Sequence, residues 1–148
     1  MSAKNLILYY SYTGNTAKMA KKLAEKRGGD LFEVRDVKRP SKLAAFTAGG
    51  LRALLGKPWP IEPVPLDLAG YAQITIMSPI WAGRPTPAIN SLFALLPPGK
   101  KVEVVMVSGS GKCACMEQIE ALLEAKSCTL TNFRSVRGSL AKQLTMDN

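Results

Sequence analysis

The fold of this chain is decided by residues 6–16, LILYYSYTGNT, where an apolar run leads directly into a turn rich in glycine and hydroxyl groups. The apolar half predicts a strand buried on both faces, as in a parallel sheet. A helix-forming segment follows at once, so the backbone N–H groups of the turn lie at the positive end of a helix dipole and suit a phosphate. The turn contains no lysine, which excludes the nucleotide-hydrolysing P-loop and favours a phosphate monoester at the end of a retained cofactor. A plain strand-to-helix turn capped by Ser or Thr is the alternative.

Strand and helix patterns alternate along the rest of the chain. After the opening run, strands are expected at 31–37, 74–77, 102–107 and 129–136, and helices at 15–27, 41–55, 86–96 and 116–125. This order predicts a three-layer α/β fold, a doubly wound parallel five-stranded sheet with helices on both faces. The first, third and fourth strands are almost entirely apolar, whereas the second and fifth alternate. The strand order 2-1-3-4-5 follows, with its switch point between the first and third strands.

The composition is typical of one globular domain spanning residues 1–148. Hydrophobic residues make up 47% and charged residues 21% of the chain, which is enough to bury a core. No apolar run approaches the roughly 20 residues that cross a bilayer, and the N-terminus lacks a signal-peptide layout. We therefore expect a cytoplasmic protein without a membrane partner. The net charge is +9 and histidine is absent, which excludes histidine-based triads, metal sites and proton shuttles. No catalytic residue or metal site is predicted, and the chemistry is expected from a bound group.

Three loops are expected to meet at the switch point, because each follows a central strand. They are residues 11–16, 78–87 and 108–113. In the second loop, Trp81 offers a flat face that could stack on a ring, and Gly83 would let the backbone approach that ring closely. A packing role is the alternative for Trp81.

These loops resemble those of flavodoxins. Residues 11–16, SYTGNT, resemble the phosphate loop for flavin mononucleotide (FMN), and residues 79–87, PIWAGRPTP, are similar to the second flavin loop of short bacterial flavodoxin-like proteins. Residues 108–111 are placed like the third loop, and the resemblance covers about residues 5–137. It implies a flavodoxin-like fold that binds FMN noncovalently.

The resemblance also implies which residues contact FMN. The phosphate is assigned to Ser11, Tyr12, Thr13, Gly14, Asn15 and Thr16. One side of the flavin ring is assigned to Ile80, Trp81, Ala82 and Gly83, with Pro79 opening that loop, and the pyrimidine edge to Ser108, Gly109, Ser110 and Gly111. We place the guanidinium of Arg84 near the same edge, with a solvent-pointing arginine as the alternative.

Electron transfer to a protein partner is the function that this resemblance favours. The alternatives are an NAD(P)H-dependent flavin or quinone oxidoreductase that uses bound FMN, and a flavodoxin fold without a cofactor. Electron-shuttling flavodoxins are typically acidic, whereas this chain is basic, and Lys112 and Cys113 stand where many members place a second aromatic ring. The basic residues of the N-terminal third are either solvated helix faces or a docking patch for an acidic redox partner. No nucleic-acid motif accompanies them.

Three further features bear on the site and the assembly. Residues 109–114, GSGKCA, fit a dinucleotide fingerprint, but the acidic residue that it requires is missing from 127–136. Cys113 and Cys115 could form a redox pair or part of a metal site. We interpret all three cysteines as ordinary thiols, because a C-x-C motif with one further cysteine, Cys128, and no histidine is a weak signal. Only residues 139–148 stand where the family has a closing helix. We expect a homodimer to cover the sheet face left open; coverage by the tail itself and a truncation that leaves the protein marginally stable are the alternatives.

Overall fold

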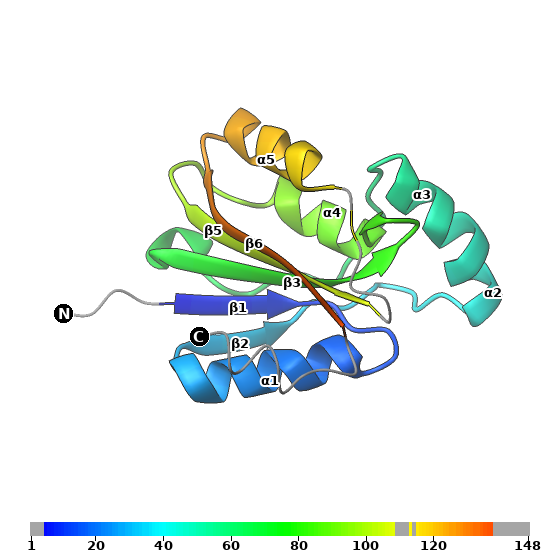
Figure 1. Cartoon of the computed structure of the whole chain (residues 1–148), viewed down its shortest axis with the longest axis horizontal. Helices are drawn as coiled ribbons and strands as arrows, with labels where there is room; N and C mark the ends of the chain where they lie inside the picture. Colours follow the sequence, from blue (N-terminus) through cyan, green and yellow to red (C-terminus); the bar gives the residue numbers. More distant parts are fainter. Residues whose placement is uncertain (1–4, 109–112, 114, 138–148) are drawn as a thin grey trace.

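The computed structural model describes residues 5–108, 113 and 115–137, and its centre is a parallel sheet (Figure 1). The parallel strands are β1 (Asn5–Tyr9), β2 (Asp30–Glu33), β3 (Gln73–Trp81), β5 (Lys101–Ser108) and β6 (Thr129–Arg137). Their order is β2-β1-β3-β5-β6. Counted along these five strands, this is the predicted order 2-1-3-4-5, so the predicted fold class is confirmed. The switch point lies between β1 and β3.

The segment after β3 differs from the prediction. β3 continues through residues 78–81 and then turns back as the short antiparallel β4 (Arg84–Pro85), which pairs with Ile80 and Trp81. Ala82 and Gly83 form the two-residue turn, and both have a positive φ, of 52° and 78°. Such a turn matches the twist of the two strands that it joins. Pro79, Ile80 and Trp81 therefore lie on a strand, where the sequence predicted a loop.

Three helices cover the two faces of the sheet (Figure 1). α1 (Asn15–Arg27) lies on one face, and its Met19, Ala20 and Leu23 pack against β1, β3 and β5. α4 (Pro87–Ala94) and α5 (Met116–Ala125) lie on the other face over a larger apolar cluster. Among the helices of the described residues, none combines the length and apolar character needed to span a membrane.

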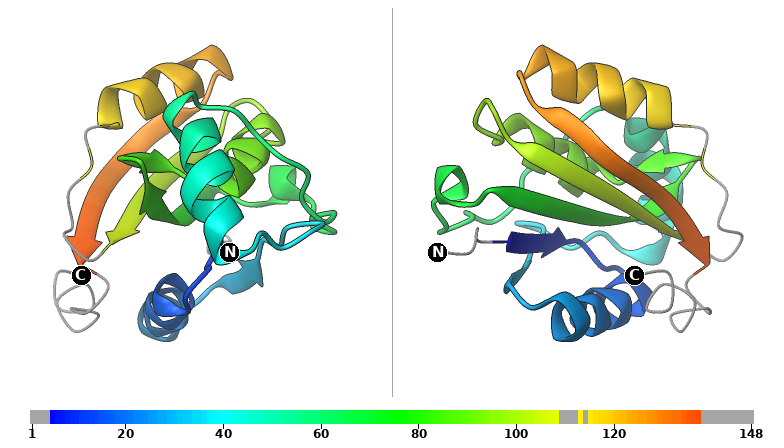
Figure 2. Two further views of the ribbon diagram at one scale, coloured as in Figure 1. Left: turned by 90° about the vertical axis from the view of Figure 1, so that its right-hand side faces the viewer. Right: turned by 60° about the vertical axis from the view of Figure 1, so that its left-hand side comes forward.

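The predicted helix at 41–55 is one continuous helical run of three parts. α2 (Lys42–Ala44) leads into a π-helical turn, η1 (Ala45–Gly49), and α3 (Gly50–Leu54) follows. The left view of Figure 2 shows that this run stands beyond the carboxyl ends of the strands. A short 3₁₀ helix, η2 (Leu68–Gly70), then precedes β3. The helical run is therefore placed to form a wall at the edge where ligands of this fold bind.

A partly buried ion pair links the sheet to the end of α1. Glu103 on β5 is 3% exposed, and its carboxylate accepts from Arg27 at 2.5 and 3.3 Å. Thr75 and Asn132 on the neighbouring strands donate to the same carboxylate, each at 3.0 Å. Burial on its own raises the pKa of Glu103, but the hydrogen bonds and the charge of Arg27 outweigh it and hold that pKa below its usual value.

Candidate functional site

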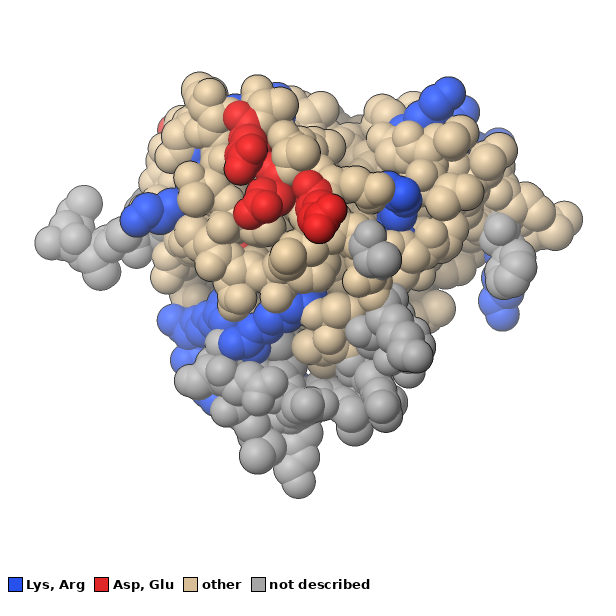
Figure 3. Space-filling view, turned by 45° about the horizontal axis from the view of Figure 1, so that its top comes forward, with Lys and Arg blue, Asp and Glu red and all other residues tan. Residues whose placement is uncertain are grey.

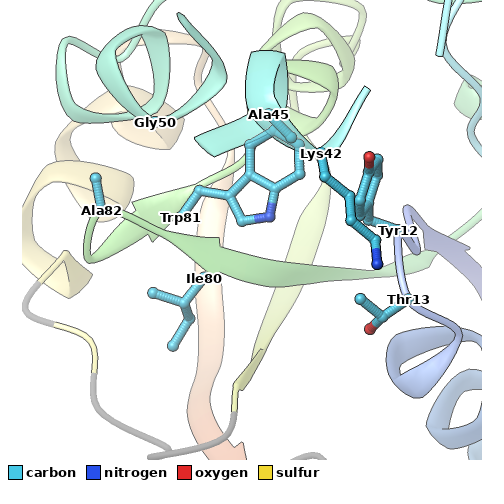
Figure 4. A pocket seen from close by; sticks show the side chains of 8 residues that line it. All are labelled: Tyr12, Thr13, Lys42, Ala45, Gly50, Ile80, Trp81 and Ala82. Atoms are coloured by element: carbon cyan, nitrogen blue, oxygen red, sulfur yellow. The ribbon is translucent and has the colours of Figure 1, made fainter. Parts of the chain in front are cut away.

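A cavity of about 530 Å³ lies at the carboxyl edge of the sheet, close to the switch point. Three segments line it: the turn after β1, the helical run and the end of β3 (Figure 4). The lining residues are Tyr12, Thr13, Lys42, Ala45, Gly50, Ile80, Trp81 and Ala82. The wall from β3 and the helical run is mainly apolar, whereas the turn after β1 and Lys42 make the opposite end polar. This arrangement suits a flat apolar ring that carries an anionic tail.

The turn after β1 leaves the start of α1 open to an anion. The N-cap residue is Gly14 at φ 101°, and it provides no side-chain hydrogen bond to the first turn. The helix therefore lacks the Ser or Thr N-cap of the alternative interpretation. The Ser11 hydroxyl accepts from the Gly14 N–H at 3.1 Å, and Thr16 is buried. Of the four hydroxyl-bearing residues assigned to the phosphate, Tyr12 and Thr13 line the cavity, whereas Ser11 and Thr16 do not. Asn15 is exposed at the first position of α1.

Two cations near this turn come from outside it. Figure 4 shows the Lys42 side chain extending from α2 toward Tyr12 and Thr13. The Arg39 guanidinium lies 4.5 Å from the centre of the Tyr12 ring and donates to the Tyr12 carbonyl. The sequence predicted an anion held by hydroxyl and amide groups alone, because no lysine stands within the turn. Nothing local relates Lys42 to a turn about 30 residues earlier; only the fold brings the two together.

The indole of Trp81 is held in one orientation by other aromatic rings. Tyr10, Tyr12 and Trp59 all meet it edge to face, with ring centres 6.1, 5.7 and 5.7 Å away. Gly49 packs against the same indole, and a Cβ built there would lie 2.7 Å from Cζ3 of Trp81. Trp81 is half-buried and lines the cavity, so one wall of the site is a fixed aromatic surface.

A buried carboxylate fixes two of those supporting rings. The Tyr10 hydroxyl donates to Oδ2 of Asp36 at 2.7 Å, and the Trp59 indole donates to Oδ1 at 2.8 Å. Burial raises the pKa of Asp36 above its usual value, although both hydrogen bonds act in the opposite direction. Burial and the bond to Asp36 also raise the pKa of Tyr10, which stays a neutral donor. The role of Asp36 is not recognisable in the sequence, because a single aspartate after a strand carries no motif.

We expect Asp36→Ala to cost about 2–3 kcal/mol of unfolding free energy, because it removes the acceptor of the buried Tyr10 hydroxyl and of the half-buried Trp59 indole. Asp36→Asn should cost less, since an amide can still pair with Tyr10 and Trp59. Urea unfolding at pH 7 compares the two variants.

The raised pKa of Asp36 means that the folded state binds the Asp36 proton more tightly than the unfolded state. Wild type should therefore gain stability relative to Asp36→Asn as the pH falls through that raised pKa. Equal losses for both variants at pH 7 would contradict the two-donor arrangement.

Several predicted site residues lie outside the cavity lining. The guanidinium of Arg84 donates to Gln118 of α5, and Arg84 lines a separate, smaller cavity with α5 residues. Pro79 is half-buried on β3, and Gly83 forms the turn to β4. Ser108 ends β5. The rest of the predicted third loop, Gly109, Ser110 and Gly111, lies outside the described residues, and so does the tail at 139–148.

Two of the three cysteines form a disulfide. Cys113 and Cys115 are bonded to each other with their Cα atoms 5.6 Å apart, whereas Cys128 is free and buried. The interpretation of all three as ordinary thiols is therefore wrong for this pair. Cysteines two residues apart can meet only where the backbone brings their Cβ atoms together, and composition does not report that geometry.

The surface charge is distributed unevenly. Figure 3 shows acidic side chains gathered over α5, where Glu117, Glu120 and Glu124 are exposed. The exposed lysines of α1 are Lys18, Lys21, Lys22 and Lys26. A net charge of +9 therefore coexists with a local acidic face, and a docking patch on the basic side stays a prediction.

Comparisons with known proteins place the chain among flavodoxin-like structures. No protein-family model and no curated protein matches its sequence. A flavoprotein from Lactobacillus acidophilus, solved in complex with FMN, is 26% identical, with a TM-score of 0.69 over 97% of this chain and 99% of that one. A candidate flavoprotein from Bacteroides uniformis is 23% identical, with a TM-score of 0.77 over 99% and 97%. The flavodoxin of Megasphaera elsdenii is 19% identical, with a TM-score of 0.56 over 95% of each chain.

Proposed function

The chain has a flavodoxin-like fold, and we propose that it binds FMN noncovalently and passes electrons to a redox partner. The observation that carries this proposal is the cavity of about 530 Å³ with an apolar aromatic wall and a polar end at the start of α1. FMN has the same division, with a flat ring at one end and a phosphate monoester at the other. The likeness to a flavoprotein solved with FMN supports the proposal.

The residues present fit each part of that cofactor. The uncapped N–H groups at the start of α1, the Thr13 hydroxyl and the Lys42 ammonium form a donor set for a phosphate dianion. Trp81 and Ile80 offer apolar surface for the ring. Bound FMN would supply the redox chemistry, and the protein would supply orientation and local electrostatics.

The ring contacts that hold Trp81 in one orientation affect ligand binding. Trp81 contacts three rings, two of which are held by the Asp36 carboxylate, so its side chain loses little conformational freedom when it contacts a ligand. The wall is therefore preorganised, which favours tight retention of the cofactor. Retention suits an electron carrier, since a carrier keeps its flavin between partners.

Titration of the purified protein with FMN tests the proposal. We expect quenching of flavin fluorescence that saturates near one FMN per chain, and a flavin absorption spectrum that persists through gel filtration. A colourless protein that leaves added FMN fluorescent would overturn it. Oxidation of NAD(P)H with small acceptors separates the two redox functions: a carrier should catalyse it negligibly, and an oxidoreductase should turn over many times.

Substitution of Lys42 tests the assignment of the phosphate end. We expect Lys42→Gln to weaken FMN binding about fivefold, close to 1 kcal/mol for a partly solvated ion pair. Riboflavin has the same ring without the phosphate, so its affinity should not change. Lys101→Gln is the matched control, because Lys101 opens β5 at the opposite edge of the sheet. Equal weakening for FMN and riboflavin would place the Lys42 contact elsewhere.

A further inference from the structure

The Cys113–Cys115 disulfide lies at the same edge of the sheet as the cavity, but its chemistry needs no flavin. Cys115 is the N-cap residue of α5, and Cys113 precedes it by two positions. The Cys113 Sγ lies 3.2 Å from the carbonyl oxygen of Gly83, in the turn that follows Trp81. A disulfide sulfur has no proton to donate, so this is a contact in the oxidised form. Gly83 becomes a hydrogen-bond acceptor only for the reduced thiol.

The two sulfur-bearing residues differ in accessibility. Cys115 is 1% exposed, whereas Cys113 is half-buried and lines a surface cavity of about 360 Å³ with Met116, Glu117 and Gln118. An incoming thiolate can therefore reach Cys113, while the body of the protein shields Cys115. Disulfide exchange depends on which sulfur is attacked and on access to it.

Stabilisation of the fold does not account for the Cys113–Cys115 disulfide. A disulfide stabilises a fold chiefly by restricting the unfolded chain, and that effect grows with the length of the loop that it closes. The loop between Cys113 and Cys115 has a sequence separation of two, so it removes little freedom from the unfolded chain. A bond that contributes little to stability and presents one accessible sulfur is suited to reversible chemistry.

We propose that the Cys113–Cys115 disulfide is a thiol–disulfide exchange site for a dithiol reductant. One thiolate of the dithiol attacks Sγ of Cys113, forming a mixed disulfide and releasing Cys115 as a thiolate. The second thiol of the reductant then attacks its own sulfur in the mixed disulfide and releases Cys113. The dithiol leaves as a disulfide, and its two electrons and two protons end on Cys113 and Cys115.

The residues around the disulfide favour attack at Cys113 with Cys115 as the leaving group. Cys115 is the leaving group, and it stands at the N-terminus of the ten-residue α5, where the helix dipole stabilises a thiolate. A more stable leaving thiolate departs faster. After reduction, the Cys113 thiol can donate to the Gly83 carbonyl that it already contacts, so the reduced form has a ready partner.

Thiol counting on the native protein tests the proposal with and without added FMN. Before reduction, we expect no thiol that reacts with an aromatic disulfide reagent, because Cys128 is buried. Dithiothreitol should make Cys113 reactive at once in the native protein and Cys115 reactive at least about tenfold more slowly, because Cys115 is buried. Oxidised glutathione should then remove both thiols again. Reduction by dithiothreitol only after the protein is unfolded would overturn the proposal. So would isolation of the protein with all three thiols free, if oxidised glutathione then failed to form the Cys113–Cys115 disulfide. FMN binding is measured separately, so failure here leaves the flavin proposal untouched.

A pair of single variants in a Cys128→Ala background identifies the attacked sulfur. Cys115→Ser leaves Cys113 as the free thiol, and Cys113→Ser leaves Cys115. We expect Cys113 to form a mixed disulfide with the aromatic reagent at least about tenfold faster than Cys115, because burial shields the second thiol. Mass spectrometry of the adducts assigns each site, and far-ultraviolet circular dichroism checks that both variants fold. Equal rates would contradict attack at Cys113.

Discussion

Alanine at Gly49 is expected to destabilise the protein by about 1–3 kcal/mol, whereas alanine at Gly50 should stabilise it by about 0.5–1 kcal/mol. Both glycines have helical backbone angles. They differ in the neighbours of an added Cβ. At Gly49 the Cβ would lie 2.7 Å from the Trp81 ring, whereas at Gly50 its nearest neighbour would be the Ala45 carbonyl oxygen, 4.0 Å away. The Trp81 ring cannot shift cheaply, because Trp59 and two tyrosines hold it.

Urea unfolding of the two alanine variants, followed by circular dichroism, measures this difference. The Gly50→Ala variant is the matched control, since it makes the same chemical change one residue away. Tryptophan fluorescence should also shift at Gly49→Ala, because the indole of Trp81 must move to admit the methyl group. Two variants of equal stability would show that Trp81 is free to adjust and that the aromatic wall is not fixed.

Removal of the Glu103 carboxylate is expected to cost about 2–4 kcal/mol at pH 7. Loss of one partner of a fully buried ion pair typically costs about 3–5 kcal/mol, and the cost is lower here because the Arg27 side chain is 28% exposed. Glu103→Ala would leave Arg27 without this carboxylate and would also remove the acceptor of Thr75 and Asn132. Glu33→Gln is the control, because Glu33 pairs with a largely exposed Arg35 and should cost at most about 1 kcal/mol.

The same variant gives a pH dependence of definite sign. The folded-state pKa of Glu103 lies below its usual value of 4.5, so the unfolded state binds its proton more tightly. The contribution of the ion pair is therefore fully present above pH 4.5 and is lost as the pH falls through the lower, folded-state pKa. Urea unfolding of wild type and Glu103→Ala at pH 7 and pH 3 should show a smaller gap at pH 3. A gap that stays constant would exclude a contribution from ionised Glu103.

The parts of the fold that the sequence predicts are those set by local pattern. The helices at 15–27 and 116–125 have the predicted bounds, because their apolar residues recur at helical spacing and glycine ends the first. The strand order follows from which strands are apolar on both faces. Neither inference needs knowledge of which distant residues touch.

The features that the sequence did not predict depend on contacts between distant segments. Ser78 and Pro79 have the composition of a turn, yet β3 continues through them because β4 pairs with its end. Gly49 and Gly50 lie inside the helix predicted at 41–55, and only the position of Trp81 explains why the first of them is a glycine. Lys42 reaches the turn after β1 through the fold, and the Cys113–Cys115 bond depends on backbone geometry. Tertiary context overrides local preference at each of these positions.

The π-helical turn at Ala45–Gly49 makes one wall of the cavity sensitive to the length of the chain. Such a turn holds one more residue than the same stretch of α-helix, and each residue advances an α-helix by about 100°. Deletion of one residue within the turn would rewind it to an α-helix and rotate the residues that precede it, including Lys42, by about 100° relative to α3. The dimensions of the cavity are thus set by a count of residues as well as by their identity, and related chains could acquire different ligand preferences through a single insertion or deletion here.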